Sequence, residues 1–60
     1  MTTFDNYESA KEFAEIRFED IENGESILIM KKDNEYLVTC DYREAKNDGY
    51  EYITELYKNI

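Results

Sequence analysis

Apolar residues in the first third of the chain recur with the period of an α-helix. At about 100° per residue, one side of that helix collects the apolar positions Ala10, Phe13, Ala14, Phe18 and Ile21. Ser9 and Glu12 have the spacing of a capping box. Asn23-Gly24 is typical of a helix C-cap, since glycine adopts the left-handed conformation easily. The pattern predicts an amphipathic helix from about residue 9 or earlier to residue 23.

The middle of the chain has the pattern of a β-hairpin. Ser26–Met30 and Tyr36–Cys40 are rich in β-branched and apolar residues, and Asp33-Asn34 between them tolerates the positive φ of a tight turn. Pairing through this turn predicts three cross-strand pairs, namely Met30 with Leu37, Ile29 with Val38 and Leu28 with Thr39.

Both faces of this hairpin are apolar, which is unusual for a strand pair with one face in water. One face carries Leu28, Met30 and Leu37, and the other carries Ile27, Ile29, Tyr36, Val38 and Cys40. An isolated hairpin is only marginally stable, so something must cover the second face or extend the edge. We therefore expect a homodimer whose interface is formed by Ile27, Ile29, Tyr36, Val38 and Cys40.

The last segment repeats the pattern of the first helix. Asp41 and Glu44 have the spacing of an N-cap and its reciprocal acid. On a helical wheel, one side collects Tyr42, Ala45, Gly49, Ile53, Leu56 and Ile60. A break at Asn47-Asp48-Gly49, with a fresh helix from Asp48, is the alternative. The expected fold is a small α+β domain of order α-β-β-α, with both helices packed on the hairpin and residues 1–60 in a single domain.

The charge balance restricts the possible partners. The chain has 60 residues, with 7 Lys+Arg against 15 Asp+Glu and a net charge of -8. Nucleic acids and anionic membranes would repel it, whereas a basic protein surface would attract it. The sequence offers neither a secretory signal nor a stretch of about 20 apolar residues that could span a membrane. A cytoplasmic location is therefore expected.

The residue types needed for most catalytic and metal sites are missing. The sequence has no histidine, a single cysteine and two separated glycines. This excludes the usual zinc sites, a cysteine–histidine pair and a glycine-rich phosphate loop. Cys40 is expected among apolar neighbours, where a thiol behaves as a small hydrophobic group. We predict a protein without catalytic residues, cofactor or metal.

Carboxylates occupy the side of each predicted helix that is opposite the apolar residues. The first row is Glu8, Glu12, Glu15, Glu19 and Glu22, and the second is Glu44, Asp48, Glu51 and Glu55. Side chains three or four apart on a helix stand about 5–6 Å apart, similar to the spacing of phosphates along a DNA strand. Such rows are usually a solvated helix face. The presence of two rows in so acidic a chain favours the alternative, in which the carboxylates imitate nucleic-acid phosphates and bind a protein that normally grips nucleic acid.

The size, acidity and Lys/Asn/Asp/Glu/Ile/Tyr-rich composition resemble those of small phage proteins that block host enzymes, such as anti-CRISPR proteins and uracil-DNA glycosylase inhibitors. The resemblance implies an inhibitor of a host defence or DNA-handling protein with a basic nucleic-acid-binding groove. Two alternatives are open. One is an interaction subunit or antitoxin-like regulator that docks through the apolar hairpin face. The other is a purely structural small dimer.

Overall fold

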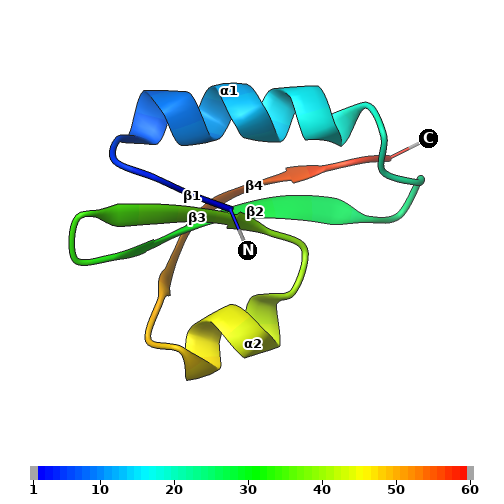
Figure 1. Ribbon diagram of the computed structural model, residues 1–60. Coiled ribbons are helices and arrows are strands. Elements are labelled where there is room, and N and C mark those ends of the chain that lie inside the picture. The colour runs from blue at the N-terminus through cyan, green and yellow to red at the C-terminus, as the bar shows by residue number, and fades with distance from the viewer. Residues whose placement is uncertain (1, 60) are drawn as a thin grey trace.

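The computed structural model describes residues 2–59 and has the element order β-α-β-β-α-β (Figure 1). The elements are β1 (Thr2–Phe4), α1 (Tyr7–Phe18), β2 (Ser26–Lys32), β3 (Glu35–Thr39), α2 (Tyr42–Asn47) and β4 (Glu51–Tyr57). The prediction of a small α+β protein with two helices and a central hairpin is confirmed. The predicted order α-β-β-α is wrong, because a further strand lies at each end of the chain.

The four strands form one antiparallel sheet in the order β1-β3-β2-β4. The pairs of the central hairpin are those predicted, with Leu28 opposite Thr39, Ile29 opposite Val38 and Met30 opposite Leu37. Asp33 has φ of 56°, so the Asp33-Asn34 turn uses the positive φ that its residue types tolerate. The hairpin edges are extended by β1 and β4.

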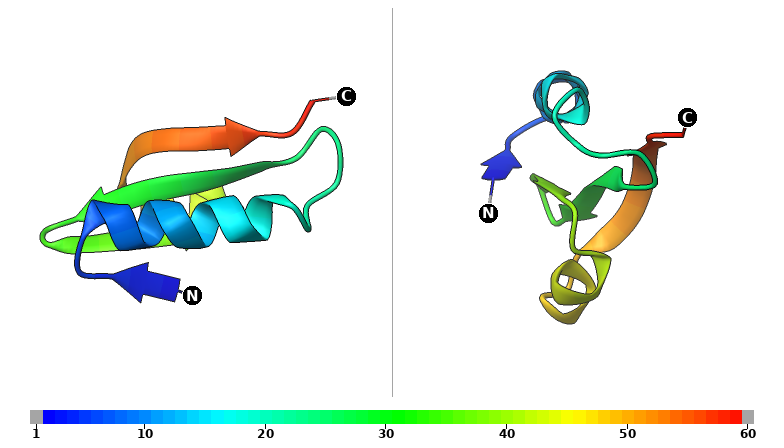
Figure 2. Two further views of the ribbon diagram at one scale, coloured as in Figure 1. Left: turned by 90° about the horizontal axis from the view of Figure 1, so that it is seen from above. Right: turned by 90° about the vertical axis from the view of Figure 1, so that its right-hand side faces the viewer.

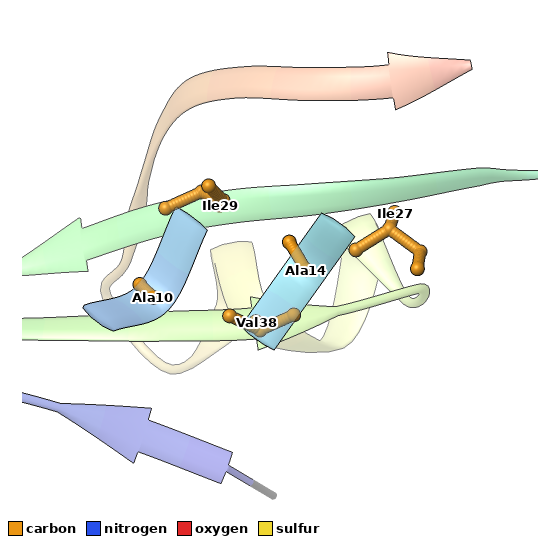
Figure 3. Packing of buried hydrophobic residues seen from close by; sticks show 5 residues of the cluster. All are labelled: Ala10, Ala14, Ile27, Ile29 and Val38. Carbon is orange, nitrogen blue, oxygen red and sulfur yellow. The ribbon is translucent and has the colours of Figure 1, made fainter. Parts of the chain in front are cut away.

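The two helices cover opposite faces of the sheet (Figures 1 and 2). Ala10 and Ala14 of α1 are fully buried, and their small side chains let the helix lie close to β2 and β3. Figure 3 shows them over Ile27, Ile29 and Val38. The other face forms a second core with α2 and the residue before β4, made by Leu28, Met30, Leu37, Ala45 and Tyr50. The chain therefore covers both apolar faces of its own hairpin.

Helix α1 ends earlier than predicted, whereas its start at Tyr7 agrees with the prediction of residue 9 or earlier. The side chain of Asn6, not Ser9, is the N-cap, and it accepts a hydrogen bond from the Ser9 amide at 2.8 Å. The helix ends at Phe18, where Lys58 Nζ donates to the carbonyls of Phe18 at 3.3 Å and Glu19 at 3.1 Å. Gly24 does have a positive φ of 92°, but it lies in the loop beyond the helix. Its amide donates to the Lys58 carbonyl at 2.7 Å.

Helix α2 is much shorter than predicted. Asp41 is its N-cap, as expected, and accepts from the Glu44 amide at 3.0 Å. The helix ends at Asn47, and Gly49 has φ of 95°, which a continuing right-handed helix does not allow. The following residues form β4 along the edge of β2, so a fresh helix from Asp48 is wrong too. Ile60 lies outside the described residues.

Candidate partner-binding surfaces

The first predicted carboxylate row lies on the outer side of α1 and continues beyond it. Glu8, Glu12 and Glu15 are on the helix, on the side opposite Ala10 and Ala14, which face the sheet. Glu19 is the C-cap residue and Glu22 is in the following loop; all five glutamates are exposed. Ile16, which is not among the apolar residues that face the sheet, is also exposed at 66%. The glutamates of this row therefore have helical spacing only as far as the end of α1.

The second predicted row is divided among different elements. Glu44 lies on α2, Asp48 is its C-cap, and Glu51 and Glu55 lie on β4. All four are exposed. Because α1 and α2 cover opposite faces of the sheet, the two rows cannot lie side by side (Figure 1). The two rows therefore do not form two parallel lines of charge.

Basic side chains in the structure contact aromatic rings and backbone carbonyls. Arg17, Lys31, Lys32 and Lys58, four of the seven cations, lie 5.3–5.9 Å from the centroids of aromatic rings. Lys32 Nζ also donates to the Asp48 carbonyl at 2.9 Å, much as Lys58 donates to the end of α1. In residues 2–59, the hydrogen bonds of lysine side chains thus end on main-chain oxygens. None of these lysine hydrogen bonds reaches a carboxylate.

The residues of the predicted dimer interface do not form a free face. Ile27, Ile29 and Val38 are buried beneath α1, and Tyr36 is half-buried with its ring 6.0 Å from that of Tyr7. Cys40 is exposed, contrary to the expectation of an apolar environment, because β3 ends before it. The prediction of a dimer depends on an uncovered hairpin face. Helix α1 covers that face instead.

Two polar features could suggest chemistry but are better explained structurally. A half-open cavity of about 360 Å³ between α1 and the end of β3 includes Arg17, Asp20 and Cys40 in its lining. These residues do not pair a nucleophile with a general base. Elsewhere, the Tyr50 hydroxyl donates to Glu35, and this hydrogen bond, with burial and the Glu35 charge, raises the pKa of Tyr50 to about 12. Tyr50 is therefore protonated at neutral pH, and its hydroxyl links the residue before β4 to the first residue of β3.

Strand β4 is the surface feature that the helical pattern missed. It is seven residues long and lies at the sheet edge, with exposed Tyr52, Ile53 and Tyr57. A signal for it was present, since tyrosine, isoleucine and threonine are frequent in strands and Gly49 precedes them. The repeated three- and four-residue spacing of apolar positions favoured a helix instead.

Comparisons with protein-family models, curated proteins and solved structures found no match. Within residues 2–59, neither helix is long and apolar enough to cross a membrane. The same residues contain no cluster of three or more Cys, Asp or Glu side chains arranged to hold a metal ion. The candidate surfaces are therefore interpreted from their own geometry and charge.

Proposed function

We propose that this protein is a non-catalytic inhibitor that places the outer side of α1 on a basic, nucleic-acid-binding surface of another protein. The observation that carries the proposal is the row of exposed glutamates on a helix whose opposite side is fixed to the sheet by two buried alanines. A fixed helix presents its carboxylates at about 5–6 Å intervals without further ordering. The partner would be a host defence or DNA-handling protein of the kind that small phage inhibitors block.

The arrangement supports imitation of one nucleic-acid strand rather than two. Within residues 2–59, only α1 offers a row of carboxylates at regular helical spacing, and α2 lies on the far face of the sheet. Exposed Ile16 follows Glu12 by one helical turn and adds an apolar contact beside the charges. The net charge of -8 would also accelerate the approach to a basic groove.

Charge reversal on α1 tests the proposal against a matched control. The test variant carries Glu12→Lys, Glu15→Lys and Glu19→Lys. The control carries Glu44→Lys, Asp48→Lys and Glu51→Lys, which change the net charge equally but lie away from α1. Each protein is immobilised and exposed to a bacterial lysate at low salt, after circular dichroism has shown that the variants are folded.

We expect the natural chain and the control to retain proteins that duplex DNA displaces, and the test variant to lose them. Retention should also weaken as salt is raised, because the screening length falls from about 10 Å at 0.1 M to about 3 Å at 1 M. Equal retention by both variants, or retention that duplex DNA does not affect, would contradict docking through α1.

The alternative of an interaction subunit that docks through the apolar hairpin face has less support. That face forms the core beneath α1, and the opposite face forms the core beneath α2. A partner could reach either face only after a helix had been displaced.

A further inference from the structure

Strand β4 forms a long open edge of the sheet. It pairs with β2 on one side, and β1, the strand at the other edge, is only three residues long. Figure 2 shows β4 at the border of the sheet with no other described element beyond it. An edge strand of this kind exposes unpaired amide and carbonyl groups, which another extended chain can use for hydrogen bonding.

The exposed apolar side chains of the protein are concentrated on this edge. Tyr52, Ile53 and Tyr57 are exposed at 46%, 43% and 56%, and they are three of the five large exposed apolar residues within 2–59. Tyr52 lies opposite Met30 and Tyr57 opposite Ser26, so both tyrosines lie on the face of the sheet that carries α2. Such grouping is typical of an interaction surface rather than of scattered surface residues.

The β-bulge limits where a new strand can pair. The register shifts between Ile29 and Met30, which leaves Ile53 as the extra residue of β4. A regular ladder on the outer side is therefore available along Thr54–Tyr57. The bulge and the charged residues also protect the edge against indiscriminate pairing.

The negative charge of Glu55 on β4 favours a basic partner over a second copy of this chain. Glu55 lies between the two tyrosines on the α2 face of the sheet, and its Oε1 accepts a hydrogen bond from the Tyr52 hydroxyl at 3.2 Å. A second copy of this chain would bring the same carboxylates and a net charge of -8. Like charges on neighbouring strands are destabilising, whereas a lysine or arginine opposite a glutamate is favourable.

We propose that the outer edge of β4 binds an extended basic segment of a partner protein as an additional strand. The segment pairs with Thr54–Tyr57, sets a lysine or arginine beside Glu55, and packs apolar side chains against Tyr52 and Tyr57. Main-chain hydrogen bonds supply affinity and the alternate side chains supply specificity, as in other cases of strand addition. This surface is separate from the α1 glutamates and goes beyond the proposed function.

The test uses the full chain, labelled with ¹⁵N, and a synthetic peptide of alternating lysine and valine that is as long as β4. We expect the amide resonances of β4 to shift and the exchange of its outward-facing amides to slow. Two control peptides should bind far more weakly. One replaces lysine by glutamate, and the other is N-methylated at alternate residues and cannot complete a ladder.

A pair of variants separates strand addition from general attraction between charges. Glu55→Lys should weaken peptide binding about fivefold, the effect of about 1 kcal/mol for a reversed cross-strand pair. Asp5→Lys makes the same change in net charge in the exposed turn between β1 and α1, outside both proposed surfaces, and should leave binding within about twofold of the natural chain, because exposed distant charges are screened. The two proposals can fail independently. If α1 bound no partner, the shifts that the peptide causes in β4 would be unchanged.

Three results would overturn the proposal: no shift in β4, equal binding of the N-methylated peptide, or shifts confined to α1. A fourth is movement of the β4 resonances with protein concentration alone, which would assign the edge to a second copy of the chain. If Glu55→Lys does not fold, the comparison of the three peptides on the natural chain decides between these outcomes.

Discussion

Replacement of Gly49 by alanine tests the structural reason why the chain leaves α2 and enters β4. Gly49 has φ of 95°, in the left-handed region. A Cβ atom there would lie 3.7 Å from the Lys32 side chain, which is an ordinary contact, so the substitution causes no clash. The cost is therefore conformational, about 1–2 kcal/mol for an L-residue in a left-handed conformation.

Part of this cost is offset in the unfolded state. Alanine has fewer unfolded conformations than glycine, which favours folding by about 0.4–1 kcal/mol. We therefore expect Gly49→Ala to destabilise the protein by about 1 kcal/mol. For a domain of this size, that corresponds to a fall in Tm of about 4–8 °C. Thermal and urea unfolding followed by circular dichroism would measure it.

The sign of the effect decides between the two interpretations of this segment. If residue 49 were inside a helix, alanine would instead stabilise the protein by about 1 kcal/mol. Gly49→Asn provides a control, because asparagine tolerates the left-handed region better than alanine does. We expect the stability order glycine, asparagine, alanine. An alanine variant as stable as the natural chain, or more stable, would refute the reasoning.

Two further predictions concern contacts that hold β4 to the rest of the fold. Lys58→Met should destabilise by about 1 kcal/mol in urea unfolding, because it removes the cation at the carbonyls of Phe18 and Glu19; an unchanged midpoint would show that the contact contributes nothing. Tyr50→Phe should cost about 1 kcal/mol at neutral pH by removing the hydrogen bond to Glu35. Folding raises the pKa of Tyr50 from 10.0 to about 12. The contribution of Tyr50 to the free energy of unfolding is therefore fully present below pH 10 and is lost as the pH rises through 12. Measured between pH 10 and pH 12, the free energy of unfolding of the natural chain should fall by this contribution. The Tyr50→Phe variant should lack that part of the fall.

The features that could be predicted from sequence are those determined by neighbouring residues. The Asp33-Asn34 turn and the two-residue periodicity around it determine the register of β2 and β3, and the structure has that register. The Asp41 cap is equally local. The exposure of the glutamates also follows from the helical pattern of Ala10 and Ala14, which places them on the opposite side.

The features that could not be predicted depend on residues distant in sequence. Helix α1 ends at Phe18 where Lys58, 40 positions away, binds its carbonyl. The segment after Gly49 has apolar residues at helical spacing, yet β2 offers it an unpaired edge and it becomes a strand. The apolar second face of the hairpin did correctly indicate missing cover. That face is covered by α1 of the same chain. A helical wheel of α1 shows an apolar side but does not show whether that side packs on its own hairpin or on a second copy.

The same packing explains why the two proposed binding surfaces lie where they do. Both faces of the central hairpin form the cores beneath α1 and α2, whereas the outer side of α1 and the edge strand β4, with its exposed tyrosines, are open to a partner. The outer side of α1 offers regularly spaced charge with one exposed isoleucine, whereas β4 offers backbone groups with two tyrosines and one central carboxylate. The first is therefore suited to a basic groove and the second to a basic extended segment. Because they lie on different elements, α1 and β4 can engage different parts of one basic partner, and reversal of Glu12 should leave strand addition at Glu55 intact.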